Sequence, residues 1–406
     1  MERQILHVDV NNAFLSWTAI DMLHNGENID IRTIPAIIGG DESSRHGVVL
    51  AKSMKAKEFG IKTGEPIYQA RKKCPNLQVF MGDYSSYKKH SNELYELLLE
   101  YTDQIERFSI DECFMDMTLF LPPNETLLNK AYEIRKRVKE NLGFTVNIGV
   151  ANNKLLAKMA SDFTKPDKVH TLFKEEIPKK MWTLPISELF MVGRKSIPKL
   201  EQLGIKTIGD LAKQDETILI KKFGKHGKLM WEYANGIDES EVIYIQEQPK
   251  NIGNSITLPQ DIYNINKLNE ILLALSEQIA FRLRKHGLKA NVVSVQIRTK
   301  DFANYSHQKT LNSPTNITKE IYEASKELLL DLHQNRAVRL IGIQTSKLQD
   351  KESMQLSIFE EKTNEKQEKI ENVMHELKKK YGYETITRAG EMKVKKLLNV
   401  REEKNE

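Results

Sequence analysis

Two stretches of strand-like apolar pattern carry acidic side chains where a buried strand would carry hydrophobic ones. Residues 4–10 read Gln-Ile-Leu-His-Val-Asp-Val, so Asp9 stands inside an apolar run. Residues 106–118 form a second strand-like run around the adjacent carboxylates Asp111 and Glu112. A carboxylate removed from water beside apolar neighbours is costly unless it is paired or holds a cation. The pattern therefore marks these three acids as candidates for a functional site.

The geometry of a strand limits how these acids can meet. Successive strand residues point to opposite faces, so Asp111 and Glu112 reach one site only if the chain turns over there, as in a tight hairpin. Asp9 ends a second short strand that we expect to complete the site. Three carboxylates from two such strands suit two Mg²⁺ ions, which take oxygen ligands and bind through few protein groups plus substrate phosphates. The alternative, a turn with solvated acids, stays open on these residues alone.

Helical spacing and turn residues predict the other elements of residues 1–170. Pro66 and Pro75 bound a short helix, because proline restricts the helix on either side of it. We expect strands over 33–39, 47–51, 78–81 and 145–150, and helices over 14–25, 53–59, 67–73, 84–101, 126–141 and 154–163. This order of strands and helices predicts an α+β mixed sheet with helices on one side.

The remaining chain divides into a helical module, a second sheet domain and a charged tail. Residues 171–240 are helical, and residues 241–249 read as a polar, extended tether. Beyond the tether we expect strands over 252–258, 290–299, 306–312 and 337–343, and helices over 267–286 and 317–332. Residues 349–406 are rich in charge and include a helix over 365–381.

The composition is that of a folded protein of several modules, with 406 residues, 40% hydrophobic and 29% charged. No run of about 18 apolar residues occurs and the start lacks a signal-peptide pattern, so we expect a cytoplasmic protein without a membrane segment. Cys74 and Cys113 form neither a disulfide framework nor a metal-ligand spacing. The net charge of +5 is mildly basic, so any nucleic-acid face must come from local clustering.

Four motifs stand in order along the chain. They are His-Val-Asp-Val-Asn-Asn-Ala-Phe at 7–14, Gly-Val-Val-Leu-Ala-Lys-Ser-Met-Lys-Ala-Lys-Glu-Phe-Gly-Ile at 47–61, Ser-Ile-Asp-Glu at 109–112 and Ala-Ser-Asp-Phe-Thr-Lys-Pro at 160–166. In this order they resemble the Y-family translesion DNA polymerases, from about residue 3 to about residue 348. The sequence is similar to the UmuC-like branch (the ImpB/MucB/SamB group, including UvrX-type proteins) and also to DNA polymerase IV.

The resemblance implies a multidomain α+β right-hand polymerase. It places a palm, with a mixed sheet and helices, at 1–17 and 78–170, and small fingers at 18–77. A helical thumb with a helix-hairpin-helix follows at 171–240, then a linker at 241–249 and an α/β little finger at 250–348. The tail, 349–406, would hold a clamp-binding peptide at 355–359 and the C-terminal helix.

The resemblance also implies a two-metal mechanism of nucleotidyl transfer. Asp9 and Asp111 would bridge two Mg²⁺ ions, Glu112 would help to hold one of them, and the main-chain oxygen of Val10 would complete the other. Mn²⁺ is expected to substitute for Mg²⁺. The implied activity is DNA-directed DNA synthesis past damaged bases in an SOS-type response, and no segment resembles a proofreading exonuclease.

Further residues would contact the incoming dNTP. The resemblance puts Phe14 at the steric-gate position, where its ring packs under the deoxyribose, and assigns Lys57 and Lys165 to the triphosphate. Met54 and Lys57 stand where many family members have Tyr and Arg. Lys57 keeps the positive charge but lacks the bidentate fork of Arg. Without the resemblance, these residues would be read as a core ring and solvated lysines.

Primer-template DNA and a sliding clamp are the expected partners of a monomer. In the thumb, Gly193 and Lys195 would contact a DNA phosphate, and Met191 takes the place of the first glycine of the hairpin. Residues 249–348 hold about 14 Lys and Arg against 8 Asp and Glu. The expected DNA contacts there are Lys250, Arg298, Lys300, Lys309 and Arg339. The expected clamp contacts are Gln355, Leu356, Ile358 and Phe359.

Two other functions remain as alternatives. A catalytically weak module that binds DNA and the clamp is suggested by Met54, Lys57 and Met191. A nucleotide cyclase is suggested by Gly-Gly-Asp-Glu at 39–42, although Ser43-Ser44-Arg45 follows it rather than an aromatic residue in a hairpin strand. Product formed without a template would identify a cyclase.

Overall fold

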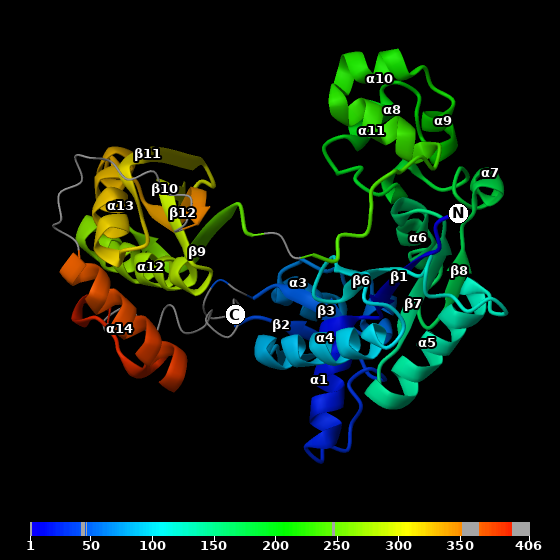
Figure 1. Ribbon diagram of the computed structural model, residues 1–406, viewed down its shortest axis with the longest axis horizontal. Helices are drawn as coiled ribbons and strands as arrows, with labels where there is room; N and C mark the ends of the chain where they lie inside the picture. The colour runs from blue at the N-terminus through cyan, green and yellow to red at the C-terminus, as the bar shows by residue number, and fades with distance from the viewer. Residues whose placement is uncertain (1, 42–44, 46, 246–247, 351–364, 392–406) are drawn as a thin grey trace. The chain divides into compact units, whose positions relative to one another are not determined.

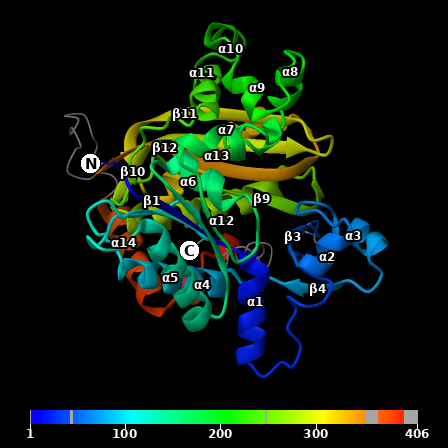
Figure 2. The same cartoon turned by 90° about the vertical axis from the view of Figure 1, so that its right-hand side faces the viewer.

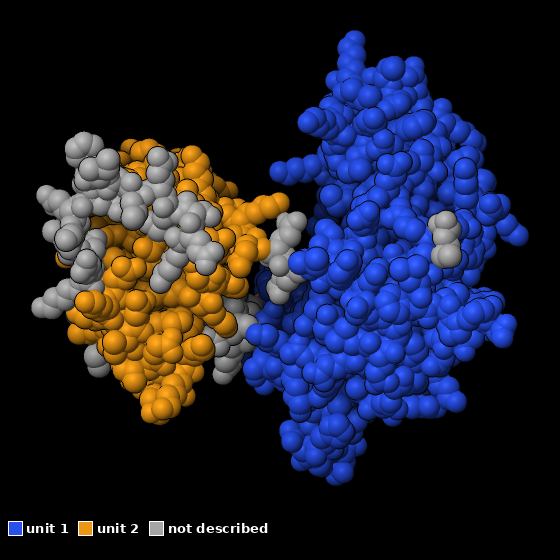
Figure 3. Space-filling model, in the orientation of Figure 1, with its two compact units in different colours: residues 1–40, 48–246 blue, residues 41–47, 247–406 orange. Residues whose placement is uncertain are grey.

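A computed structural model describes residues 2–41, 45, 47–245, 248–350 and 365–391 of the chain. The chain forms two compact units (Figure 3): unit 1 contains residues 1–40 and 48–246, and unit 2 contains residues 41–47 and 247–406. The predicted clamp peptide at 355–359 lies outside the described residues. No described helix combines the length and the apolar character that crossing a membrane needs.

Unit 1 is built on a five-stranded mixed sheet in the order β5-β6-β1-β7-β8 (Figure 1). Its central strand, β1, pairs antiparallel with β6 and with β7, and β7 pairs parallel with β8. The strands are β1 (Ile5–Val10), β5 (Ile105–Arg107), β6 (Glu112–Asp116), β7 (Val146–Ala151) and β8 (Val169–Thr171). The two acidic runs of the sequence thus lie side by side.

Helices cover both faces of β1, which is why all six of its residues are buried. Leu6, Val8 and Val10 pack in one core with α1 (Ala13–His24), α4 (Tyr84–Leu99) and α5 (Leu127–Leu142). Ile5 packs on the other face, in the core of α6 (Lys154–Ser161). Because side chains alternate along a strand, His7 and Asp9 also face α6. The prediction of helices on one side of the sheet is corrected by this second layer.

Gly149, in β7, lets α6 lie directly on the sheet. A Cβ atom at this position would be 1.8 Å from the carbonyl oxygen of Ala157 and 2.7 Å from the backbone nitrogen of Ser161. Both distances are far below van der Waals contact, so any larger residue would push the helix away. The glycine therefore sets how closely the side chains of α6 approach those of β1.

A small sheet of order β3-β2-β4 forms a second part of unit 1, with α2 and α3 beside it (Figure 2). It contains β2 (Ala36–Gly39), β3 (Val49–Lys52), β4 (Gln78–Met81), α2 (Met54–Glu58) and α3 (Ile67–Lys73). The strand predicted from residue 33 begins only at Ala36, because the preceding residues turn around the Asp30 carboxylate, which accepts hydrogen bonds from Arg32.

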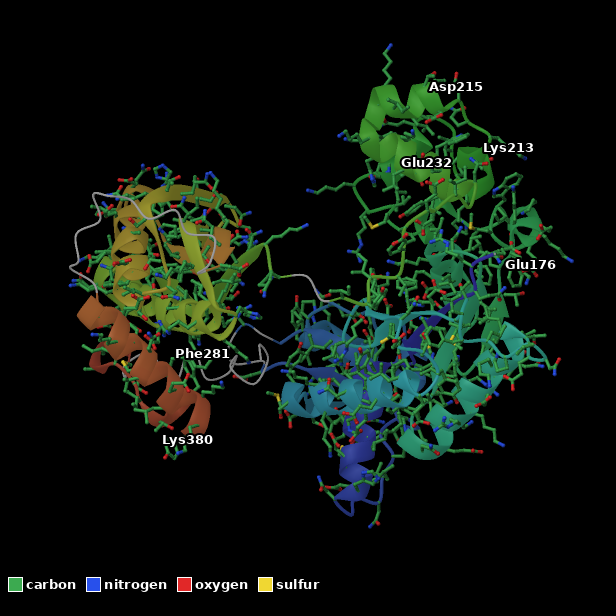
Figure 4. The ribbon with its side chains drawn as sticks, in the orientation of Figure 1. Glu176, Lys213, Asp215, Glu232, Phe281 and Lys380 are labelled. Atoms are coloured by element: carbon green, nitrogen blue, oxygen red, sulfur yellow. The ribbon has the colours of Figure 1, made fainter. Side chains whose placement is uncertain are left out.

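Short helices form the module after β8. They include α7 (Ile177–Lys180), α8 (Ile197–Glu201), α9 (Ile208–Ala212), α10 (Glu216–Phe223) and α11 (Lys225–Ala234). Thr207 caps α9, and Asp215, which is labelled in Figure 4, caps α10; each side chain accepts a backbone hydrogen bond. The apolar sides of these helices share one core with α6, as expected for a helical module built on the first sheet.

Unit 2 is an antiparallel sheet of order β11-β10-β12-β9 with helices packed on one face. Its elements are β9 (Asn251–Ile262), β10 (Leu288–Thr299), β11 (Asn304–Thr315), β12 (Val338–Asp350), α12 (Ile265–Lys285), α13 (Thr318–His333) and α14 (Glu365–Tyr381). β12 was predicted to end at 343 but continues to Asp350, because backbone pairing with β9 and β10 needs no apolar side chains.

The C-terminal helix α14 docks on α12 through aromatic and charged contacts. Phe281 on α12 (Figure 4) lies with its ring centroid 4.8 Å from that of His375 and 5.2 Å from that of Tyr383. Beside this contact, Glu277 on α12 is fully buried. A helix whose position the sequence predicted thus packs against α12 of unit 2.

Five charged side chains surround that contact, and we refer to them as the unit 2 charge network. Glu277 is 2.9 Å from Lys378 Nζ and 2.7 Å from Arg388 Nε. Glu371 is 2.5 Å from Arg388 and 3.1 Å from Arg284. Glu277, Glu371, Arg284 and Lys378 are all nearly fully buried. The network joins α12 and α14 to the segment after α14.

Candidate active site

Asp9 and Glu112 are direct neighbours on adjacent strands. They are register partners in the β1–β6 pair, on the face covered by α6. Lys158, on α6, contacts both: its Nζ lies 3.4 Å from Asp9 Oδ2 and 2.7 Å from Glu112 Oε1. The two carboxylate oxygens are therefore no further apart than the sum of these distances. The structure brings these two predicted residues together.

Asp111 occupies the turn that joins β5 to β6. Its carbonyl oxygen accepts a hydrogen bond from the backbone N–H of Val10, with an N···O distance of 3.0 Å. The side chain accepts a hydrogen bond of 2.7 Å from the Ser109 hydroxyl. The predicted hairpin is confirmed: the chain turns over residues 108–111, Asp111 is the last residue of the turn, and Glu112 is the first residue of β6.

Lys165 approaches the same acids from the loop after α6. Its Nζ is 3.0 Å from Asp9 Oδ2 and 2.9 Å from Asp162 Oδ1. The Asn11 side chain helps to hold this loop. Its Oδ1 accepts a hydrogen bond of 2.9 Å from the backbone N–H of Asp167, and its Nδ2 donates one of 3.2 Å to Asn147 Oδ1. The loop is thus fixed by groups of β1 and β7 close to the acids.

The pKa values of the two strand carboxylates, Asp9 and Glu112, are shifted in opposite directions. Burial raises the pKa of Asp9 to about 6, although Lys165 and Lys158 oppose the shift. Burial also acts to raise the pKa of Glu112, but contacts with His7 and Lys158 outweigh it and place that pKa below its usual range. Burial lowers the pKa of His7 to about 4, so this imidazole is neutral at pH 7.

A cavity of about 330 Å³ opens in front of the acids. One wall comes from the large sheet and the other from β3 and the loop before α3. The lining residues are Asp9–Phe14, Leu50–Lys52, Thr63, Asp111, Glu112, Asp162 and Lys165. Phe14 stacks on Tyr87, with ring centroids 4.7 Å apart and planes at 15°. The cavity therefore combines carboxylates, lysines and one fixed aromatic ring.

The oxygen donors of this cavity suit a hard divalent cation. In the structure, ammonium groups stand in for such a cation: Lys158 bridges Asp9 and Glu112, while Asp111 faces Ser109. Within the part of the chain that the structure describes, no three His, Cys, Asp or Glu side chains are grouped closely enough to hold a metal ion. The carboxylate oxygens of Asp9, Asp111 and Glu112 are thus the kind of ligand that Mg²⁺ prefers. For all three acids to bind the same ions, their side chains must rotate.

Lys57, one of the three residues predicted to contact the nucleotide, lies outside the cavity lining. It is exposed on α2, and Met54, at the start of the same helix, is 44% exposed. Phe14 and Lys165 do line it. The residue of the 47–61 motif that brings a positive charge into the cavity is Lys52.

In the turn before α8, Met191 adopts a backbone conformation that glycine usually adopts. Met191 has φ 70°, the left-handed conformation that glycine adopts most readily, and its side chain is 53% exposed. A Cβ atom on Gly193 would meet no heavy atom within 4 Å. Gly193 and Lys195 are both exposed. The special backbone position of this turn is therefore 191 rather than 193.

The basic residues predicted in unit 2 have different surroundings. The Arg298 Nε donates to Asn304 at 2.8 Å, and Arg339 lies over the Phe302 ring at 4.7 Å. Lys309 pairs in register with the buried Val293, on the helix side of the sheet, and forms an ion pair with Glu327 of α13. Lys250 and Lys300 are exposed, next to the ends of strands.

Sequence reasoning missed three residues of this site. His7 donates or accepts a 2.8 Å hydrogen bond with Ser161, and its Nε2 is 3.8 Å from Glu112. Lys158 could have been suspected as a lysine inside the apolar pattern of residues 154–163. No local pattern distinguishes Lys52, because its position in the cavity depends on how two sheets face each other.

Comparison with known proteins identifies relatives over nearly the whole chain. Residues 8–162 match the impB/mucB/samB family, and residues 249–358 match the C-terminal domain of that family. DNA polymerase IV of Clostridium acetobutylicum is 49% identical over 389 residues, which cover 96% of this chain and 98% of that protein. DNA polymerase IV of Acetivibrio thermocellus is 35% identical over 396 residues, covering 96% and 97%.

A solved structure shares the fold. A Y-family DNA polymerase chimera matches with a TM-score of 0.73 at 23% identity, covering 86% of this chain and 99% of that chain. This likeness confirms the predicted multidomain α+β polymerase fold. The curated relatives carry the name DNA polymerase IV, which is one of the two groups that the sequence motifs resemble.

Proposed function

Because the chain belongs to the impB/mucB/samB family and is a DNA-directed DNA polymerase of the Y family, we propose that it extends primers past damaged template bases. The observation that carries this proposal is the meeting of Asp9, Asp111 and Glu112 at one cavity with Lys165. In this proposal the enzyme acts in damage tolerance of the SOS type, in the cytoplasm, as a monomer without proofreading.

The domain roles follow the same proposal. The large sheet and its helices, from 1–17 and 78–170, act as the palm, and the small sheet, within 18–77, acts as the fingers. Residues 171–240 act as the thumb, 241–249 as the linker and 250–348 as the little finger. The tail, 349–406, carries the clamp peptide in this assignment.

Family membership implies dependence on a divalent metal, and we assign two Mg²⁺ ions, for which Mn²⁺ can substitute. Asp9, Asp111, Glu112 and the carbonyl oxygen of Val10 would hold them. When bound, such ions lower the pKa of the attacking hydroxyl and neutralise charge on the transferred phosphoryl group. The chain itself fixes the backbone of Asp9 and Glu112 on paired strands, so holding the ions would require rotation of the side chains and no change in strand pairing.

The remaining cavity residues position the nucleotide. The Phe14 ring is held against Tyr87, which supports its role as a steric gate under the deoxyribose. Lys165 would release Asp162 to contact the triphosphate, since an ammonium group can exchange one anion for another at modest cost. Lys57 would need to reach the phosphates from outside the cavity lining, which weakens its assignment.

Contacts to primer-template DNA and the clamp complete the proposal. Gly193 and Lys195 of the thumb would contact a phosphate without reading sequence, as would the basic residues of the little finger. These are Lys250, Arg298, Lys300, Lys309 and Arg339. Gln355, Leu356, Ile358 and Phe359 would bind the sliding clamp.

Primer extension tests this function directly. With purified full-length protein, Mg²⁺ and dNTPs, Asp111→Ala should abolish incorporation, because it removes a carboxylate that would hold both ions. Asp103→Ala is the matched control, since Asp103 is an exposed acid four residues before β5 ends. Incorporation opposite a panel of lesions, with and without clamp, then tests translesion synthesis.

Two outcomes would contradict the proposal. Normal extension by Asp111→Ala would mean that the site is misassigned. Normal DNA binding without incorporation by the wild-type protein would favour the alternative of a catalytically weak, DNA- and clamp-binding regulatory homologue, which the positions of Met54 and Lys57 outside the cavity motivate.

A further inference from the structure

Lys52 is one of the residues that line the active-site cavity. It is the last residue of β3 and lines the cavity with Leu50, Ala51 and Thr63. The acids of β1 and of the β5–β6 turn line the same cavity. A ligand held by metal ions at those acids would therefore have Lys52 within the same enclosure.

The backbone around Lys52 is fixed before any ligand binds. Lys52 pairs with Ile37 of β2. The next residue, Ser53, is 1% exposed and caps α2, because its hydroxyl accepts from the N–H of Ala56 at 3.0 Å. The loop that carries Thr63 is joined to β3 by hydrogen bonds between Val49 and Gly64 of 2.8 Å and between Val49 and Glu65 of 2.9 Å. Lys52 and Thr63 are thus presented together.

Lys52 differs from Lys165, the other lysine that lines the cavity, in how its charge is paired. Lys165 contacts two carboxylates. The Lys52 Nζ donates to the Thr63 hydroxyl at 3.1 Å, and within the described ranges it has no carboxylate inside ion-pair distance. Glu65, whose charge acts on Lys52, is paired with Lys73. Burial and then the nearby Lys57 lower the pKa of Lys52. An anion beside Nζ would relieve both effects.

We propose that Lys52, oriented by Thr63, binds the triphosphate oxygens of the incoming nucleotide. This inference rests on the proposed polymerase function. Phosphate oxygens are strong acceptors for an ammonium group, and charge-assisted hydrogen bonds of this kind are about twice as strong as neutral ones. Lys52 thereby supplies a positive charge from β3, inside the cavity that Lys57 of α2 does not line.

Single-nucleotide incorporation on undamaged primer-template tests the proposal. Lys52→Ala should raise the KM for dNTP about tenfold to a hundredfold, the loss expected for one charge-assisted contact, and should change kcat less. Lys52→Arg should recover most of the loss, because it keeps the charge. The Kd for primer-template, measured by fluorescence anisotropy, should stay unchanged, which separates a triphosphate contact from a contact to DNA phosphate.

Matched lysines on the neighbouring helix serve as controls. Lys55 is 54% exposed and pairs with Glu58, so Lys55→Ala should leave KM unchanged. If Lys57→Ala raises KM and Lys52→Ala does not, the assignment is wrong. A parallel rise in the Kd for primer-template would also overturn it. Tryptophan fluorescence during thermal unfolding checks folding, and Lys52→Met replaces the alanine variant if that variant unfolds.

The two proposals fail in different ways. If Asp111→Ala extends primers normally, the proposed function falls, whatever Lys52 does. If Asp111→Ala is inactive and Lys52→Ala has the wild-type KM, only the role of Lys52 is overturned.

Discussion

The molecule contains two clusters of acids and bases that are built in opposite ways. At the cavity of unit 1, Asp9, Glu112 and Asp162 share Lys158 and Lys165, so acids outnumber bases. In the unit 2 charge network, two glutamates face three cations. The first cluster lines an open cavity, whereas four of the five side chains in the second are nearly fully sealed from water.

The difference indicates what each cluster is for. Surplus carboxylates beside a cavity leave coordination capacity for cations from solution, at the cost of mutual repulsion that lysines partly relieve. Buried acids matched by several cations leave no such capacity and instead fix how helices pack. A cluster of charged residues is therefore a candidate site when it has surplus carboxylates that solvent can reach, and a structural joint when every carboxylate is paired with cations and buried.

The largest expected effect is the loss of stability when Glu277, in the unit 2 charge network, is replaced. Glu277→Gln leaves the buried Lys378 without its charged partner and Arg388 with Glu371 alone, so the free energy of unfolding of unit 2 should fall by about 3 kcal/mol or more. Glu327→Gln is the control, because Glu327 is 63% exposed in its pair with Lys309 and should cost less than about 1 kcal/mol.

The three tryptophans, Trp17, Trp182 and Trp231, all lie in unit 1, so hydrogen exchange in unit 2 is the appropriate measurement. Tryptophan fluorescence should show little change in unit 1. If Glu277→Gln and Glu327→Gln lower the free energy of unfolding equally, the unit 2 charge network stabilises the fold no more than an exposed ion pair does.

A pH titration should sharpen the same contrast. Burial acts to raise the pKa of Glu277, but Lys378 and Arg388 outweigh it and lower this pKa to about 2 from an ordinary 4.5. A lowered pKa stabilises the fold above the ordinary value, and this contribution is lost as pH falls from about 5 to about 2. The wild type should therefore lose roughly 3 kcal/mol more than Glu277→Gln across that window. Parallel curves would contradict the assignment.

The smallest expected effect is the stabilisation of unit 1 by a divalent cation at the cavity acids. A divalent cation that binds only the folded protein at ten times its Kd should stabilise unit 1 by about 1.4 kcal/mol. Urea unfolding followed by tryptophan fluorescence, with and without Mg²⁺, measures this. Hydrogen exchange in the sealed cluster should not respond to Mg²⁺, and Asp111→Asn should remove most of the gain. A Mg²⁺ response that survives in that variant would place the ion elsewhere.

Local sequence patterns predicted two kinds of feature: helices bounded by turn residues, and acids that interrupt an apolar strand. The helix bounded by Pro66 and Pro75 is observed at the expected residues, and so is α14. Asp9, Asp111 and Glu112 stood out because each interrupts an apolar pattern, which is a property of neighbours along the chain.

Long-range packing accounts for what the sequence did not predict. Lys158 approaches Asp9 only because Gly149 admits α6 to the sheet, and Lys52 enters the cavity only because a second sheet faces the first. β8 was missed because its three residues are too few for a period to be visible. The burial of Glu277 depends on a helix about a hundred residues away, which no short pattern can report.

The pairing of β1 between two antiparallel neighbours also limits how this gene can change. Inserting or deleting one residue between Ile5 and Asp9 would turn every later side chain of the strand to the opposite face. Asp9 would then point into the hydrocarbon layer formed by α1, α4 and α5, and an aliphatic residue would face the acids. Frame-preserving length changes there should be absent from active descendants, while substitutions that keep the length remain open to selection.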